Sequence, residues 1–238
     1  GYASLTANTT GYNNVAVGHT ALGANLTTVN NVAVGYGALA LNVNHNNTAV
    51  GYNALTTNAA GTTNTGVGAS ALGLNTTGNH NTAVGYASLY NNTTAASNVA
   101  VGYAALTTNT TGAGNTAVGI GALQLTTTGG SNTAIGSYAL DANTTGTTNT
   151  AVGHHSLPGH TTGANNTAVG YATFDDSTTG NHNCALGMYA GNVLTTGTYN
   201  IYIGYNASAA AVDSAQEMVI GTANVTGKGS STGFIAAS

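Results

Sequence analysis

The hydrophobic positions of this chain repeat with a fixed period, seen most clearly in the nine residues NTAVGYASL at 81–89. The glycine of this unit recurs from Gly1 to Gly221, and every interval is 17 residues except the 16 between Gly35 and Gly51. A short fixed period is typical of a solenoid in which each repeat forms one coil. The pattern predicts an all-β fold, a parallel β-roll (β-solenoid) of 17-residue coils.

Each repeat contains a short stretch in which the side chains alternate. The residue before the repeat glycine is aliphatic in all thirteen copies, and the residue two positions earlier is Val, Thr or Ile in eleven. Because strand side chains alternate between faces, this predicts a strand whose valines lie in a dry row inside the coil. The position between them is Ala in ten copies. We expect this smooth face to pack against a second sheet or a neighbouring chain. The functional interpretation of the chain depends on this geometry.

The second half of each repeat predicts a return segment and a loop. After the glycine the chain reads Tyr-x-Ala-Leu, which we interpret as a second short strand or extended corner that returns its Leu to the interior. A polar Asn-Thr-Thr-Gly loop, at 75–78 for example, then closes the coil, and the 16-residue interval is shorter here. Asn stands four residues before the glycine in twelve of thirteen copies. Coils about 4.8 Å apart would stack these side chains in a hydrogen-bonded row.

The composition excludes several classes of partner. Hydrophobic residues make up 42% of the chain, but only six side chains are charged: Asp141, Asp175, Asp176, Asp213, Glu217 and Lys228. One Lys and no Arg argue against nucleic acid and anionic membrane surfaces. No apolar run of about 18 residues is present, so we expect no membrane insertion. A thin coil buries little apolar area per ordered residue, which predicts a homo-oligomer. The chain starts in mid-repeat without Met, as expected for a processed product or a fragment.

No residue has the sequence context of a catalytic, cofactor-binding or metal-binding group. Asp175 and Asp176 are interpreted as solvated loop residues rather than a calcium site. His154, His155 and His160, in HHSLPGH, could enclose a metal if they faced a threefold axis, and otherwise are surface or loop histidines.

Three further features bear on contacts with other molecules. Pro158 marks the least regular loop and a place for a protruding contact, and Cys184 is a small buried thiol or, alternatively, an interchain disulfide. Seven tyrosines follow the repeat glycine, as a sugar-binding stripe or as packing between coils or chains: Tyr2, Tyr36, Tyr52, Tyr86, Tyr103, Tyr171 and Tyr205. Six glycosylation sequons arise at the loop position of the repeat: Asn8, Asn25, Asn75, Asn92, Asn109 and Asn143.

The repeat resembles those of known fibrous proteins. The unit N-T-A-V-G-Y-x-A-L is similar to the head repeat of YadA-like trimeric autotransporter adhesins, N-S-x-A-I-G-x-x-A/S-x-A, over residues 1 to about 205. The longer NTTG loops look like those of phage and viral tail-fibre proteins. The resemblance implies a homotrimer of left-handed parallel β-rolls. The family's head repeats are typically shorter than 17 residues, so the extra loop residues can change which surface is exposed.

The last part of the chain departs from the repeat, which divides the sequence into a repeat array at 1–204 and a degenerate last repeat with a cap and tail at 205–238. The tail resembles the segment just ahead of the intramolecular chaperone domain of self-cleaving tail fibres. That family is cut after a Ser once the trimer has assembled. A chain that stops at Ser238 fits such a product.

Together these features predict a structural fibre and host-attachment protein of a virus or phage appendage. It would be extracellular, on the virion surface, homotrimeric and bound to a host glycan or protein receptor, without catalytic activity or cofactor. One alternative is a bacterial trimeric autotransporter adhesin head, which a coiled-coil stalk and membrane anchor downstream would identify. Another is an ice-binding β-solenoid, although the Thr pairs of the repeat lie in loops.

Overall fold

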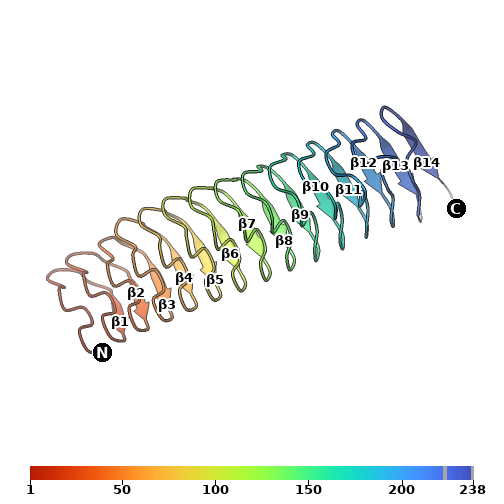
Figure 1. Ribbon diagram of the computed structural model, residues 1–238. Helices are drawn as coiled ribbons and strands as arrows, with labels where there is room; N and C mark the ends of the chain where they lie inside the picture. The colour runs from red at the N-terminus through yellow and green to blue at the C-terminus, as the bar shows by residue number, and fades with distance from the viewer. Residues whose placement is uncertain (222–223, 237–238) are drawn as a thin grey trace. The chain divides into compact units, whose positions relative to one another are not determined.

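The computed structural model describes residues 1–221 and 224–236, which form two compact units, Gly1–Ala117 and Val118–Ser238. Each unit is a stack of coils with one short strand per coil, and the strands run parallel, as Figure 1 shows. This confirms the predicted all-β solenoid. Among the described residues no helix is long and apolar enough to cross a membrane.

From β1 to β13 the strands follow one another at the spacing of the sequence repeat. The first unit contains β1 (Val15–Val17), β2 (Val32–Val34), β3 (Thr48–Val50), β4 (Thr65–Val67), β5 (Thr82–Val84) and β6 (Val99–Val101). β7 (Thr116–Val118) spans the division between the units. The second unit contains β8 (Thr133–Ile135), β9 (Thr150–Val152), β10 (Thr167–Val169), β11 (Cys184–Leu186), β12 (Ile201–Ile203), β13 (Met218–Gly221) and β14 (Gly233–Ala236).

Neighbouring strands pair so that equivalent repeat positions lie side by side. Val84 of β5 pairs with Val101 of β6, and Thr150 of β9 pairs with Thr167 of β10. The shorter repeat keeps the same register, since Val32 of β2 pairs with Thr48 of β3. The missing residue is therefore absorbed by the loop, as predicted, and the strands stay aligned.

The predicted orientation of the strand faces is wrong. Among the described residues, nine strands have as their central residue an alanine that points into the coil and is fully buried, as at Ala83 and Ala100. The residues on either side point outward, and Val17 and Ile135 are 56% and 42% exposed. The physical reason is the narrowness of the coil. A Cβ built on Gly66, the central residue of β4, would lie 3.3 Å from Leu55 Cδ1, so the leucine of the return segment already fills the space opposite the strand.

The return segment is a turn, which corrects the second strand predicted there. In the coil of Gly85, Ala87 and Leu89 both adopt left-handed backbone conformations, with φ of 51° and 50°. The N–H of Ala87 donates to Ala69 O at 3.0 Å in the preceding coil, and that of Leu89 donates to Ala105 O at 3.0 Å in the following one. The prediction for the side chain is confirmed, because Leu89 and its equivalents from Leu22 to Leu157 are fully buried.

The asparagine four residues before each glycine forms the predicted stacked row. Asn64 is buried, its Oδ1 accepts from the backbone N–H of Asn81 at 2.9 Å, and its Nδ2 donates to Gly78 O at 2.8 Å. The side chain thus bonds mainly to backbone groups of the next coil. A repeated buried amide satisfied in this way fixes the spacing of the coils and the path of the loop.

Near the end of the second unit, two buried repeat positions carry different residue types. Tyr202 takes the place of the strand alanine, and Glu217 takes the place of the row asparagine. Tyr202 Oη donates to Glu217 Oε2 at 3.1 Å, and Glu217 Oε1 accepts from the Gly229 N–H at 2.8 Å. Burial and the neighbouring carboxylate raise the pKa of Tyr202 well above its ordinary value. Parallel pairing continues beyond residue 204 to β14, and the division at 204 stays a prediction. Ser238 lies outside the described residues.

Candidate binding surface

The outward strand face carries a row of β-branched side chains along each unit. Thr48, Thr65 and Thr82 are consecutive in the first unit, and each is followed two positions later by a half-exposed valine. The second unit repeats the arrangement at Thr133, Thr150 and Thr167. Cys184 begins β11 on this face and is half-exposed, so the prediction of a buried thiol is wrong for the single chain. The face offers apolar groups and hydroxyls in register, without charge.

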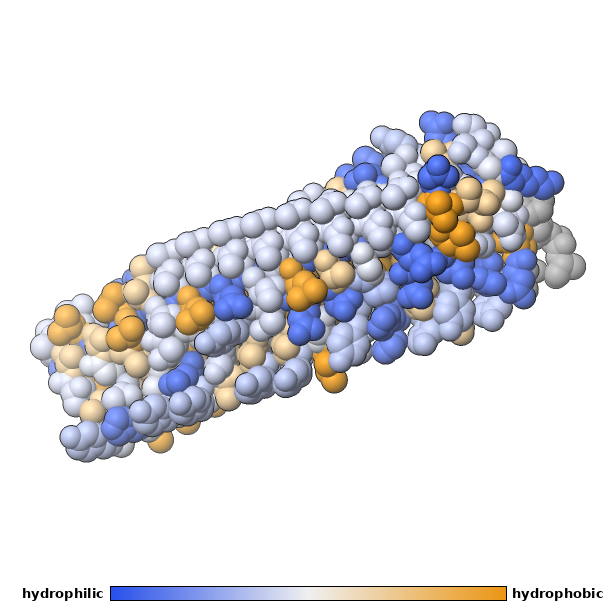
Figure 2. Space-filling view, in the orientation of Figure 1, coloured by the Kyte–Doolittle hydropathy of each residue, from blue (hydrophilic) through white to orange (hydrophobic). Residues whose placement is uncertain are grey.

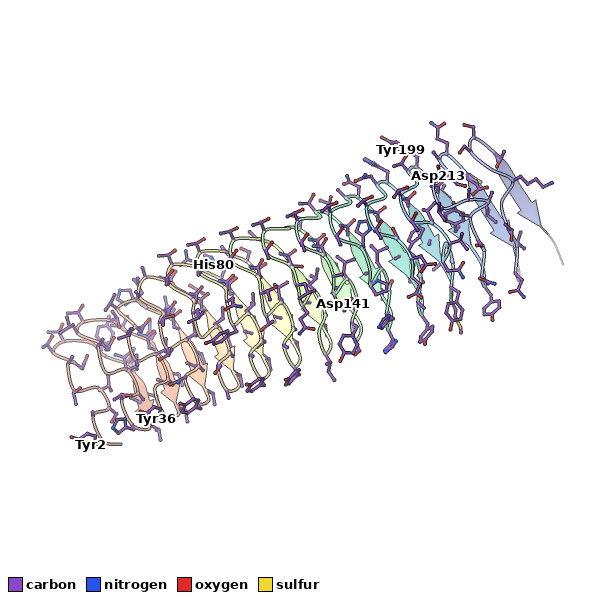
Figure 3. All side chains as sticks on the ribbon, viewed as in Figure 1. Tyr2, Tyr36, His80, Asp141, Tyr199 and Asp213 are labelled. Carbon is purple, nitrogen blue, oxygen red and sulfur yellow. The ribbon has the colours of Figure 1, made fainter. Side chains whose placement is uncertain are left out.

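The residues that follow the repeat glycine form a row of stacked aromatic rings. The ring centroids are 5.3 Å apart for Tyr2 and His19, 5.0 Å for His19 and Tyr36, and 5.5 Å for Tyr36 and Tyr52. The planes of these pairs differ by 7° to 18°. Figure 3 shows Tyr2 and Tyr36 along one edge of the first unit, with His80 on the opposite edge. The tyrosines therefore pack between coils while their outer edges remain exposed.

The aromatic row is interrupted where the sequence changes. Ala69 stands between Tyr52 and Tyr86, after which Tyr86 and Tyr103 stack again at 5.3 Å. In the second unit His154 and Tyr171 stack at 5.4 Å, and the following coil presents Met188. The row thus consists of short stacked runs of rings. Each run ends beside a coil that carries a different, non-aromatic side chain.

The three clustered histidines do not converge. His154 and His155 stack on each other at 5.3 Å near the surface, whereas His160 is fully buried inside the coil. His155 Nδ1 lies 3.9 Å from Asp175 Oδ1. The three side chains therefore cannot face one common axis, which corrects the candidate metal arrangement. Within residues 1–221 and 224–236 no group of three His, Cys, Asp or Glu could hold a metal ion.

His160 belongs instead to a second interior row that sequence reasoning did not identify. This row contains the loop asparagines, and Asn92 Nδ2 donates to Asn75 Oδ1 at 2.8 Å and to Ala95 O at 3.1 Å. Five of the six sequon asparagines are fully buried members of it: Asn25, Asn75, Asn92, Asn109 and Asn143. In the folded chain these five are inaccessible to a glycosylating enzyme. The 17-residue recurrence of the sequon was the signal that could have revealed the row.

His160 is a neutral substitute for asparagine in this second row. Its Nε2 lies 3.2 Å from Asn166 Nδ2, which can only donate, so Nε2 must accept and Nδ1 carries the proton toward Ser177 Oγ at 3.3 Å. Burial lowers the pKa of His160 from 6.5. Asn143 Oδ1, in the preceding coil, is buried and has no hydrogen-bond partner among the described residues.

We expect His160→Asn to raise the free energy of unfolding by about 1 kcal/mol, because the new amide can donate to Asn143 Oδ1. It should also reduce the acid sensitivity of the chain. A buried histidine with a lowered pKa destabilises the fold as the pH falls from 6.5 toward its folded pKa, since the unfolded chain binds the proton more tightly. Urea unfolding at pH 7.5 and 5.0 measures both effects. His154→Asn, at the surface, is the control, and an unchanged pH dependence in His160→Asn would contradict the assignment.

Two other predicted surface features have different outcomes. Asp175 and Asp176 are exposed in their loop, which confirms them as solvated residues. Pro158 is buried and its carbonyl accepts from the Ala142 N–H at 3.1 Å, so the prediction of a protruding contact at this loop is wrong. Burial raises the pKa of the nearby Asp141, although His155 opposes this shift. In the view of Figure 2 most surface residues are of intermediate hydropathy, and the strongly hydrophobic ones form small separate groups.

Comparison with known proteins gives no relative for this surface: the chain matches no protein-family model, no curated protein and no solved structure. The outward strand face and the aromatic row are therefore the two features of the molecule that bear on its function.

Proposed function

We propose that this chain is the repeat region of a homotrimeric structural fibre that projects from a virion or phage particle and attaches to a host surface. Catalysis is not part of this proposal. The observation that carries it is the outward strand face, where most coils present a pair of β-branched residues that are partly exposed in the single chain. The row of inward valines on which the sequence-based interpretation depended is absent, because these side chains point outward. The proposal relies instead on burial of these valines between chains.

The energetics favour packing of this face. Six valines precede the repeat glycines of the first unit and lie on the outward face: Val17, Val34, Val50, Val67, Val84 and Val101. Val17 is 56% exposed and the other five are less exposed. Removing the exposed part from water contributes about 1 kcal/mol for Val17 and about 0.5 kcal/mol for each of the others, or about 3–4 kcal/mol per chain in one unit. The side chains of residues 1–117 include no Asp, Glu, Lys or Arg, so formal charges do not oppose the approach of identical chains. Many small contributions in register suit a repetitive homo-oligomer.

We expect light scattering to give a molar mass of three times 23.1 kDa, or about 69 kDa. Val67→Lys, Val84→Lys and Val101→Lys, combined in one chain, should reduce the mass to 23.1 kDa, because burying three ammonium groups per chain opposes assembly. A control with the same added charge places Lys at the exposed loop positions Thr77, Thr94 and Thr111 and should remain trimeric. A wild-type mass of 23.1 kDa would exclude the trimer.

A second candidate function, ice binding, is favoured by one observation. The Thr pairs of the repeat lie in loops, but the outward face also carries three consecutive strand threonines in each unit. Parallel strands about 4.8 Å apart would present their hydroxyls as a regular array. A monomeric mass together with thermal hysteresis in purified protein would support this function over the fibre.

A bacterial trimeric adhesin head remains an alternative with the same trimeric build. The domains encoded downstream of this chain distinguish the two fibrous proposals. A coiled-coil stalk and a membrane anchor encoded downstream would support the bacterial adhesin. A chaperone domain encoded there would support the tail fibre.

A further inference from the structure

The interruption of the aromatic row in the first unit leaves one ring position vacant. We call Tyr52, Ala69 and Tyr86 the open rung. Tyr52 stacks on Tyr36 on one side, and Tyr86 stacks on Tyr103 on the other. Each of these two terminal rings therefore has one face directed along the row toward the coil of Ala69. Tyr52 and Tyr86 are 57% and 55% exposed.

The dimensions of the open rung suit one inserted ring. Tyr52 and Tyr86 are two coils apart, a separation of about 10 Å for coils spaced by about 4.8 Å. A flat ring placed midway would stand about 5 Å from each tyrosine. That distance matches the 5.0 to 5.5 Å between neighbouring ring centroids elsewhere in the first unit. The inserted ring would complete the row at its own spacing.

The second unit contains a filled equivalent of this arrangement. Tyr171 and Tyr205 occupy the same repeat position two coils apart, and the coil between them presents the long side chain of Met188. Tyr189 also packs edge-on against Tyr171, with centroids 5.5 Å apart. The corresponding position of the first unit carries only the methyl group of Ala69. The vacancy is thus a property of one coil, set by one side chain.

We propose that the open rung binds a neutral pyranose ring of a glycan between Tyr52 and Tyr86. This proposal rests on the attachment function proposed above and names its ligand class. The axial C–H groups of a pyranose carry partial positive charge, and the face of a tyrosine ring is negative, so both faces of the sugar can stack. Asn53 and Ser70, next in the chain after Tyr52 and Ala69, are half-exposed and carry neutral polar groups for the sugar hydroxyls.

The residues around the open rung favour a neutral ring over a charged one. Residues 1–117 contain no Lys or Arg side chain to pair with a phosphate or a carboxylate, so a nucleotide or an acidic sugar gains nothing from charge. An aromatic side chain of another protein would be held by the same two faces, and the experiment below separates it from a sugar. The open rung is surface rather than a pocket, so one site should bind with a Kd of about 1 mM. Three copies on a fibre would add avidity.

The test uses the whole chain, after its molar mass has been measured. Saturation-transfer NMR and calorimetry would be run with methyl β-D-glucopyranoside, cellohexaose and maltohexaose, and with p-cresol as an aromatic probe. We expect at least one saccharide to bind, with saturation transfer strongest at its ring C–H protons. Ala69→Tyr should weaken that binding at least tenfold, because the added ring occupies the vacancy. Tyrosine holds this position in seven other coils, so the variant should fold.

A matched control separates loss of the site from the addition of a tyrosine. Ser137→Tyr adds the same ring at the same repeat position in the second unit, away from the open rung, and should leave saccharide binding unchanged. Binding of p-cresol alone, or saccharide binding that survives in Ala69→Tyr, would overturn the proposal. Absence of saccharide binding by a protein of trimeric mass would overturn it while leaving the fibre intact. A monomeric mass would count against the fibre separately.

Discussion

Replacing Gly85 with alanine is expected to lower the free energy of unfolding by more than about 3 kcal/mol. Gly85 has φ of +131°, a conformation that side-chain-bearing residues rarely adopt. A Cβ at this position would lie 2.5 Å from Gly102 O and 2.7 Å from Gly102 C, which are backbone atoms of the next coil. Relief requires the two coils to separate, and this would weaken the 2.8 Å hydrogen bond from Gly102 N to Val84 O.

Thermal and urea unfolding of Gly85→Ala measure this loss. The matched control is Gly159→Ala, because a Cβ there meets its nearest atom, Ser177 O, at an ordinary 3.5 Å, and its φ is outside the left-handed range. We expect the control to change stability by less than about 1 kcal/mol. Equal stability of the two variants would mean that stacking of the coils does not require glycine at this repeat position.

The period of the sequence predicts most of this fold, because the period depends only on the number of residues in a coil. It predicts the strand, its register across the 16-residue repeat, the buried leucine and the asparagine row. It does not identify the inward strand face, since alternation shows only that two faces differ. Volume decides the question: Leu55 enters from the return segment, and a Cβ at the central position of the following strand, Gly66, would lie only 3.3 Å from Leu55 Cδ1.

The sequence does not predict the backbone conformation of the return segment. Leucine disfavours positive φ, so nothing in Tyr-x-Ala-Leu indicates that Leu89 has φ of 50°. Hydrogen bonds to the coils on either side compensate for this local cost. The aromatic row was predicted only as two alternatives, a sugar-binding stripe or packing. The ring spacing shows that the tyrosines do pack between coils, and the single exchange at Ala69 is what leaves two ring faces for a ligand.

Changing Asn92 to Asp is expected to cost about 3–5 kcal/mol at pH 7, because it places a carboxylate inside the second asparagine row. Asn92 is fully buried, and its Nδ2 donates to both Asn75 Oδ1 and Ala95 O. An aspartate offers only acceptors, so Asn75 Oδ1 loses its donor, Ala95 O keeps only the bond from Asn81 Nδ2, and both oxygens face a negative charge. Asn91→Asp is the matched control, one residue away and half-exposed, and should cost less than about 1 kcal/mol.

The pH dependence distinguishes buried charge from simple loss of packing. In the folded Asn92→Asp variant, burial would raise the pKa of the introduced carboxyl above the value of about 3.9 that it has in the unfolded chain. The deficit should therefore be smallest at and below pH 3.9, where a protonated carboxyl can donate one bond, and should grow as the pH rises through the folded pKa. Comparing each variant with the wild type at every pH cancels the contribution of His160. A deficit that stays constant from pH 4 to 7 would show that Asn92 fills space in the coil and that its amide donors are dispensable.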